Sequence, residues 1–364
     1  MTDKAKQIVL TAVMAALVLA LSVLCLFSPL TEYSLSERRS LAGRPEFTAD
    51  RVFSGQFASD FERFTQDQFP LREEFRALKS ATSLYLFRQK TVNDLYLAEG
   101  HISKVVPWIE ERMIEHATER FRFLQETYFP EKTPLLAVVP DKNFYLAEKN
   151  GFLTFDHAEL METLREALPA FSVTDLSELL TLEDYYTTDT HWRQERITHV
   201  ADFLAGQFGR TLPQEYREVP MHVPFYGVYH GQLALPVKPD VISYLENPTI
   251  SGLSVTSYDS GAPESVDLYN AQKGEGKDGY ELFLGGSHAV LTIENPAAEG
   301  ELVVFCDSFG QSMAPLLAQG YGKTTLVDIR YIQSAMVGAF VNFEHADVLF
   351  LYSTMMLNQA SVLK

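Results

Sequence analysis

A short, unbroken apolar run followed by a polar turn marks the centre of the predicted fold. Residues 302–305 are all apolar, and Asp307, Ser308 and Gly310 follow, before a segment, 312–318, that is typical of a helix. A short run rich in Val and Phe predicts a strand buried on both faces of a parallel sheet. The turn that leaves such a strand lies at the carboxyl edge, where open α/β folds place their sites. We therefore expect the hydroxyl of Ser308 to stand clear of the core, beside the N-terminus of a helix.

Strands and helices that alternate over residues 91–364 predict an α/β domain. The predicted strands include 135–139, 324–328 and 347–352, and the predicted helices include 108–128, 159–168 and 193–208. Residues 210–270 have scattered Pro and Gly and no long period, which indicates an irregular, β-rich insertion. Residues 281–293 predict a hairpin around Gly285 and Gly286. The expected fold is a mostly parallel sheet between helices.

Residues 8–30 have a different pattern, a nearly unbroken apolar run without a charge. As a helix they would reach about 34 Å, enough to cross a bilayer core of ~30 Å. Lys4 and Lys6 precede the run, which favours a cytoplasmic N-terminus and an external remainder. A cleaved signal peptide is the competing interpretation, but its apolar region is usually shorter, and no convincing small-x-small site precedes Thr31. We therefore expect residues 1–30 to be a membrane anchor or, as the alternative, a signal segment.

Residues 31–90 connect this segment to the α/β domain. Residues 31–50 are polar and irregular, and aromatic residues then recur at helical spacing, among them Phe57, Phe61 and Phe64. Pro70 interrupts the pattern and predicts a break between two helices. We interpret these residues as a juxtamembrane linker and a helical leader that serves as a packing scaffold.

Charge and composition restrict the partners. The chain has 364 residues, a net charge of −18 and a pI near 4.9. An acidic surface repels phosphate, so we expect no nucleic acid partner, whereas a neutral glycan would not be repelled. The two cysteines are Cys25, in the apolar leader, and Cys306, so no disulfide is expected between them. The sequence has no Gly-rich phosphate loop and no Cys/His cluster, and we therefore expect neither a cofactor nor a metal.

Ser308 requires a base, because a serine hydroxyl alone is a poor nucleophile. Asp189 and His191 are two residues apart, so in an extended or turn segment they point the same way. Asp189 can then accept from one ring nitrogen of His191 and leave the other for Ser308, which is the logic of a catalytic triad. Backbone N–H groups near Ser308, or one within residues 227–231, would hold the oxyanion.

Neighbouring residues offer competing chemistry. His288 is a rival base, although a histidine at a strand edge is more often simply exposed. Cys306 is a second potential nucleophile, but such a cysteine is more often a small buried residue. Asp189, His191 and Asp307 form a potential metal site, an interpretation that leaves the serine at the strand exit unexplained. We therefore favour the serine mechanism.

These motifs resemble a known family. Asp189-Thr190-His191-Trp192, together with Asp307-Ser308-Phe309, resembles the DHHW family of bacterial proteins. The chain is also similar to the alginate O-acetylation proteins, whose domain is SGNH-hydrolase-like, and Thr190 in place of a histidine brings it closer to that variant. The resemblance covers most of the chain and includes residues 61–72, 139–142 and 326–331.

The resemblance implies a fold, a place and a function. The fold is an SGNH-hydrolase-like three-layer α/β/α domain behind a single transmembrane helix in the bacterial cell membrane, with the domain outside the cytoplasm. The function is that of a serine esterase or O-acetyltransferase that acts on an exported polysaccharide through Ser308, His191 and Asp189. A membrane-bound O-acyltransferase is the expected acyl source. Substrate contacts are expected from Arg330, Lys142, Trp192 and Tyr331. The alternative function is a catalytically inactive envelope protein that binds glycan or assembly partners.

Overall fold

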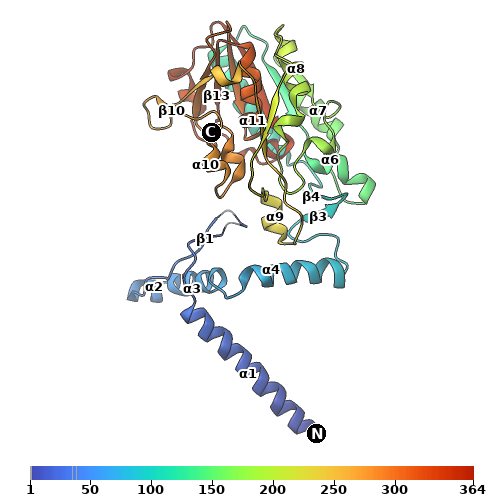
Figure 1. Ribbon diagram of the computed structural model, residues 1–364, viewed down its shortest axis with the longest axis vertical. Coiled ribbons are helices and arrows are strands. Elements are labelled where there is room, and N and C mark those ends of the chain that lie inside the picture. Colours follow the sequence, from blue (N-terminus) through green and yellow to red (C-terminus); the bar gives the residue numbers. More distant parts are fainter. Residues whose placement is uncertain (1, 35, 38) are drawn as a thin grey trace. The chain divides into compact units, whose positions relative to one another are not determined.

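The computed structural model describes residues 2–34, 36–37 and 39–364 and divides into two compact units (Figure 1). The first comprises residues 1–93 and 231–236, and the second comprises residues 94–230 and 237–364. Met1, Leu35 and Arg38, which fall within the predicted anchor and linker, lie outside the described residues.

The first unit begins with α1 (Asp3–Phe27), which is long and apolar enough to cross a membrane. The helix ends before the predicted apolar run does, because Ser28 adopts an extended conformation ahead of Pro29. The elements that follow are β1 (Tyr33–Ser34), β2 (Arg39–Ser40), α2 (Ala49–Phe53), α3 (Gln56–Asp67) and α4 (Arg72–Ala81), which continues into a π-helical turn, Thr82–Leu86. Pro70 lies between α3 and α4, so the predicted break between two helices is confirmed.

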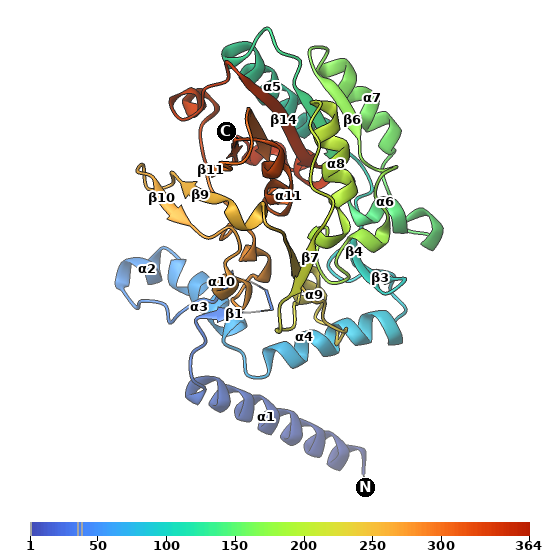
Figure 2. The ribbon, with the colours of Figure 1, turned by 45° about the horizontal axis from the view of Figure 1, so that its top comes forward.

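The second unit is built on an eight-stranded sheet with the order β10-β9-β11-β13-β12-β14-β5-β6. The five strands from β13 to β6 are parallel, and β10, β9 and β11 continue the sheet in antiparallel pairing (Figure 2). The sheet strands in chain order are β5 (Leu135–Val139), β6 (Ser172–Asp175), β9 (Ser254–Ser257), β10 (Glu264–Val266), β11 (Val290–Glu294), β12 (Glu301–Cys306), β13 (Lys323–Val327) and β14 (Ala346–Ser353). Two separate antiparallel pairs are β3 (Leu95–Ala98) with β4 (His101–Lys104) and β7 (Arg217–Pro220) with β8 (Ser243–Glu246).

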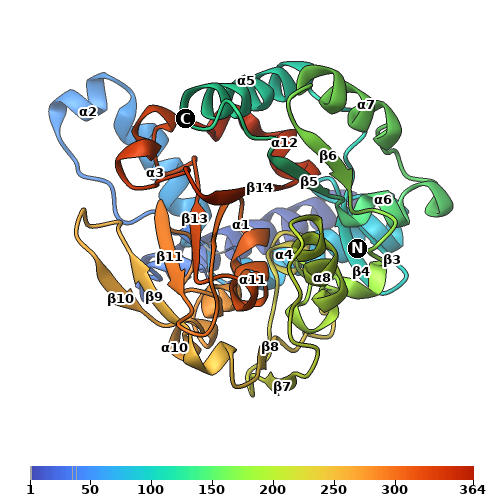
Figure 3. The same ribbon diagram turned by 90° about the horizontal axis from the view of Figure 1, so that it is seen from above.

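Each central strand is buried on both faces because successive side chains point to opposite sides. In β12, Leu302 and Val304 belong to one hydrophobic core, and Val303 and Phe305 belong to the other. Figure 3 shows α8 (Thr198–Gln207) and α11 (Phe309–Leu317) on one side of the sheet, and α5 (Glu111–Tyr128) and α7 (His157–Ala167) on the other. The shorter helices are α6 (Lys142–Leu146), α9 (Val228–Leu233), α10 (Ala271–Gly274) and α12 (Thr354–Leu357). The predicted three-layer α/β/α fold is confirmed.

Two predicted elements differ from the structure. In the region predicted as a helix over 193–208, a 3-10 turn, Gln194–Arg196, precedes α8, so no α-helix starts directly after Trp192. The hairpin predicted around Gly285 and Gly286 is wrong, because a 3-10 turn, Gly279–Leu282, precedes these glycines and β11 follows them. Both glycines do have positive φ, 74° and 104°, so the turn was recognised but its flanking elements were not. Strand β11 pairs with β9 and β13 instead.

Candidate active site

Ser308 lies where β12 gives way to α11, and Asp307 fixes this turn. One carboxylate oxygen of Asp307 accepts the N–H of Phe309 at 2.9 Å. The other accepts the N–H and the hydroxyl of Ser353, at the end of the neighbouring strand β14, at 3.0 and 2.7 Å. Asp307 therefore joins the end of β12 to the end of β14 through hydrogen bonds. Ser308 itself is only half-buried, at the N-terminus of α11.

His191 connects Ser308 to Asp189. Its Nε2 lies 2.7 Å from Ser308 Oγ, and its Nδ1 lies 2.5 Å from an Asp189 carboxylate oxygen. A carboxylate only accepts hydrogen bonds, so Nδ1 carries the proton and Nε2 is free to accept from the serine hydroxyl. Asp189 is completely buried, and His191 is 9% exposed. This is the hydrogen-bonded order that a serine nucleophile needs.

The loop that carries Asp189 is held from two sides. The carboxylate of Asp240 accepts the backbone N–H groups of Thr187 and Thr188, at 2.9 and 2.8 Å, and also both of their hydroxyls. The second oxygen of Asp189 accepts the N–H of Val228 at 2.8 Å. Gly227 allows this approach, since a Cβ there would lie 2.3 Å from the Cβ of Asp189. Both contacts orient the carboxylate toward His191.

These contacts narrow the expectation that an N–H within residues 227–231 holds the oxyanion. The N–H of Gly227 donates to the Thr188 hydroxyl, and those of Tyr229 and His230 donate to the Thr188 carbonyl, so residues 227–230 brace the Asp189 loop and leave no N–H for an oxyanion. The N–H of Ser308, by contrast, meets no acceptor within the described part of the chain. It is therefore the available backbone donor beside the hydroxyl.

Tyr280 is a neighbour of the triad that the sequence did not indicate. Its ring lies parallel to the His191 ring, with centroids 3.9 Å apart and planes at 10°. Its hydroxyl donates to Ser312 Oγ at 2.7 Å, which fixes the tyrosine against α11. The ring of Phe309 also lies beside the imidazole, with 5.0 Å between the two ring centroids. The two rings restrict the imidazole to the plane in which it meets Ser308 and Asp189.

Two residues expected to contact substrate lie in the interior. Trp192 is fully buried, and its indole N–H donates to Ser312 Oγ at 2.8 Å, so its role is to pack the loop against α11. Lys142 is 1% exposed, and its ammonium donates to the carbonyl oxygens of Tyr186 and Thr187 at 2.9 and 3.2 Å. The substrate contacts predicted for these two residues are therefore incorrect, because a ligand cannot reach side chains that the core encloses.

Arg330 and Tyr331 lie at the end of β13, beside the end of β12. Arg330 forms a forked ion pair with Asp328, with Nε–O and Nη2–O distances of 2.9 and 2.5 Å. Its Nη1 has no partner among the described residues, and its guanidinium lies 5.4 Å from the centre of the Tyr331 ring. Tyr331 is 55% exposed. These two side chains remain available for a ligand.

The competing residues are engaged elsewhere. Both ring nitrogens of His288 are occupied, Nδ1 by Asp259 at 2.6 Å and Nε2 by the carbonyl of Leu284 at 2.9 Å. Cys306 is buried, which raises the pKa of its thiol well above the usual value. No group of three potential metal ligands is found among the described residues. None of these alternatives places a nucleophile on one ring nitrogen of a histidine and a carboxylate on the other, as Ser308, His191 and Asp189 do.

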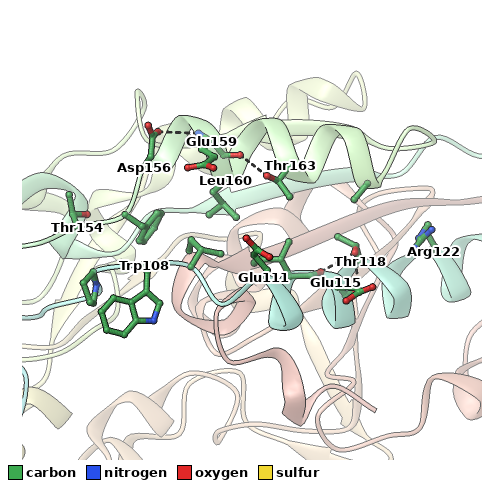
Figure 4. A pocket seen from close by; sticks show the side chains of 15 residues that line it. Trp108, Glu111, Glu115, Thr118, Arg122, Thr154, Asp156, Glu159, Leu160 and Thr163 are labelled. Carbon is green, nitrogen blue, oxygen red and sulfur yellow. Dashed lines mark hydrogen bonds between the residues drawn. The ribbon is translucent and has the colours of Figure 1, made fainter.

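A large cleft of the second unit lies apart from these residues. It has a volume of about 830 Å³ and runs between α5 and α7, and none of the triad residues lines it (Figure 4). Trp108 and the carboxylates of Glu111, Glu115, Asp156 and Glu159 face it. The hydroxyls of Thr118 and Thr163 in its lining donate to backbone carbonyls of their own helices and to no carboxylate, so the candidate chemistry remains with Ser308.

The fold and the site together define a class, a three-layer α/β/α protein with a Ser-His-Asp arrangement at the carboxyl edge of its parallel strands. The structure is similar to a DHHW family protein from Eubacterium siraeum, with a TM-score of 0.58 and 16% identity, covering 75% of this chain and 95% of that one. It is also similar to Bacillus cereus PatB1, with a TM-score of 0.55 and 18% identity, covering 73% and 97%. At these identities the likeness confirms the predicted resemblance at the level of the fold.

A third structure, the O-acetyltransferase domain of Pseudomonas putida AlgJ, matches with a TM-score of 0.37 and 13% identity over 68% of this chain and 84% of that one, which is too weak to support an argument. No protein-family model and no curated protein sequence matches the chain.

Proposed function

We propose that the protein is a cell-surface serine esterase or O-acetyltransferase that acts on an exported polysaccharide. The observation that carries this proposal is the continuous chain of hydrogen bonds from Ser308 through His191 to Asp189. The fold shared with the DHHW protein and PatB1 supports it, and α1 supplies a means of staying at the membrane. A membrane-bound O-acyltransferase would supply the acyl group.

The geometry supports a two-step acyl transfer. Ser308 Oγ attacks the carbonyl carbon of the donor ester while its proton passes to His191 Nε2, and the N–H of Ser308 holds the resulting oxyanion. The intermediate then expels the donor alcohol, which takes the proton from His191, and an acyl-serine remains. In the second step His191 removes a proton from a sugar hydroxyl or from water, which attacks the acyl-serine and restores Ser308. Asp189 stabilises the imidazolium in both steps, and Arg330 and Tyr331 are the proposed substrate contacts.

An activated aryl acetate tests this mechanism without knowledge of the natural glycan. Ser308→Ala should abolish turnover, and Asp189→Asn should lower kcat by as much as ~10⁴-fold, because the amide favours the wrong histidine tautomer. Ser260→Ala, in the exposed loop between β9 and β10, is the matched control and should behave as wild type. Acetyl transfer to an added oligosaccharide would then separate a transferase from an esterase.

A second measurement identifies the nucleophile directly. The structure of PatB1 contains a sulfonyl adduct, which suggests a sulfonyl fluoride as the probe for this chain. Intact-mass analysis should show one adduct on wild type and on Ser260→Ala, and none on Ser308→Ala. Normal turnover and normal labelling of Ser308→Ala would refute Ser308 as the nucleophile, because another residue would then carry the reaction. A wild-type protein that neither turns over the acetate nor takes up the probe would favour the inactive, glycan-binding alternative.

A further inference from the structure

The first unit covers a group of its large apolar side chains only in part. On α3, the rings of Phe57, Phe61 and Phe64 follow one another with centroids 5.9 and 6.3 Å apart. Further large apolar side chains are exposed on α4 and the π-helical turn, where Leu78 and Leu86 are 61% and 71% exposed. An apolar surface of this kind on a protein marks a partner or a membrane, because water contact with it is unfavourable.

The apolar face of α3 is turned toward α1. A cavity of about 900 Å³ lies between the two helices, lined by Val18, Leu21 and Cys25 of α1 and by the aromatic rings of α3. The ten residues from Val18 to the end of α1 at Phe27 span ~14 Å along the helix axis. If α1 spans a bilayer, the cavity therefore opens at the depth of the acyl chains in the outer half.

Polar contacts hold the end of α3 at the level where α1 ends. Gln68 accepts the N–H of Thr31 at 3.0 Å and donates to the Thr31 carbonyl at 2.9 Å, so the residue after α3 is bound to the segment that leaves α1. Asp67 accepts from Arg39 at 2.9 and 2.5 Å and from the N–H of Ala42. The hydrogen bonds to Arg39 lower the pKa of Asp67 to about 2, so the contact persists at any physiological pH.

One positively charged side chain, that of Arg44, lines this cavity. Arg44 lines it together with Pro45 and Phe47, is exposed, and has no ion-pair partner among the described residues. A guanidinium beside an apolar cavity suits a ligand that joins a phosphate to an acyl chain. That combination is a phospholipid of the bilayer.

We propose that α3 and α4 lie in the outer interface of the membrane, with their apolar faces against lipid, and that a phospholipid occupies the cavity between α1 and α3, its chain against the aromatic rings and its phosphate near Arg44. This inference rests on the proposed anchoring of the protein by α1. It predicts that the helical leader lies on the membrane surface.

Spin labels on the full-length protein in vesicles of phosphatidylethanolamine and phosphatidylglycerol test the arrangement. Labels are introduced one at a time by Phe61→Cys, Leu78→Cys, Ser59→Cys and Met14→Cys in a Cys25→Ala background, in which the buried Cys306 is unreactive. Collisions with oxygen, which concentrates in the bilayer, are compared with collisions with a water-soluble nickel chelate. Labels at positions 61 and 78 should meet oxygen several-fold more often relative to nickel than the label at Ser59, which lies on the opposite face of α3.

The label at position 14 separates this inference from the proposed anchoring. A label there that is in lipid, combined with water-exposed labels at 61 and 78, would overturn the membrane platform while leaving the anchor intact, and a membrane-protein partner would then be the better occupant of the apolar face. A label at position 14 in water would overturn both.

Native mass spectrometry with added phosphatidylglycerol tests the cavity itself: wild type should retain a bound lipid, and Arg44→Glu should lose most of it. Equal retention by both proteins would contradict the phosphate contact.

Discussion

At the scale of single residues, the site depends on a buried lysine that touches no substrate. Lys142 donates to the carbonyls of Tyr186 and Thr187, three and two residues before Asp189, and Asp240 accepts the N–H of Thr187 in the same segment. Burial lowers its pKa to about 7, although Asp189, Asp240 and Asp141 act in the other direction. In the unfolded chain its pKa would be near the ordinary value of ~10.4, so between about pH 7 and pH 10 the unfolded state binds more protons. The stability contributed by Lys142 therefore rises with pH in this window and is lost as pH falls through 7.

Lys142→Met tests this role. The substitution removes the lysine donor from the Tyr186 carbonyl, whereas the Thr187 carbonyl keeps the N–H of Ile102 at 2.8 Å. It should lower the free energy of unfolding by ~1–3 kcal/mol, because an unsatisfied buried polar group is costly. The difference in free energy of unfolding between wild type and variant should grow as pH rises above about 7. Both proteins retain Asp141, Asp189 and Asp240, so the contributions of these carboxylates cancel in that difference. Denaturant unfolding across this range provides the measurement. A difference that is constant with pH would mean that Lys142 does not titrate in this window.

At the scale of elements, the position of Ser308 depends on how closely α11 approaches β12. All residues of α11 are buried, and the approach is closest at Gly310, where a Cβ would lie 2.3 Å from Cys306 Sγ and 2.5 Å from Cys306 Cβ. Gly310→Ala should destabilise the protein by ~1–3 kcal/mol and push α11 outward. A displacement of about 1 Å at Ser308 would cost roughly 10²-fold in kcat.

Gly252→Ala is the matched control for this substitution, since a Cβ there meets nothing within 4 Å. Gly310→Ala should lower both the temperature of thermal unfolding and the rate of aryl acetate turnover, whereas Gly252→Ala should leave both unchanged. Adding Cys306→Ala should restore only part of the loss, because the Cβ of residue 306 remains in the way. Wild-type turnover in Gly310→Ala would show that the α11–β12 spacing does not position the serine.

At the scale of the whole molecule, the charge pattern around α1 predicts an orientation. Lys4 and Lys6 precede the apolar helix, which favours an N-terminus inside and a chain outside from about residue 31. Protease added to cells whose outer membrane, where present, has been permeabilised should digest the bulk of the protein and spare a cytoplasmic marker. Protection of the bulk, with digestion of the N-terminus only, would reverse the orientation and exclude an exported polysaccharide as the substrate.

Local patterns in the sequence determined the strands, the long apolar helix and the identity of the three polar residues. Burial on both faces of a strand requires an apolar run, and a membrane span requires a long one, so both can be recognised without knowledge of the partner elements. The pair Asp189 and His191 is likewise local, and Ser308 follows a strand that the pattern predicts. Their chemistry led to the expectation that they meet, and the structure brings His191 within 2.7 Å of a serine 117 residues away.

Tertiary structure alone decided what surrounds these residues. Tyr280 stacks on His191, Val228 binds Asp189, and Trp192 is enclosed by the core, although their local sequence shows no sign of these contacts. Lys142 follows a strand end, where a charged residue is usually solvated, yet the fold places two carbonyl oxygens around its ammonium. Periodicity records whether a position is buried, but the partner of a buried polar group is set by which distant segments the sheet and its loops bring together.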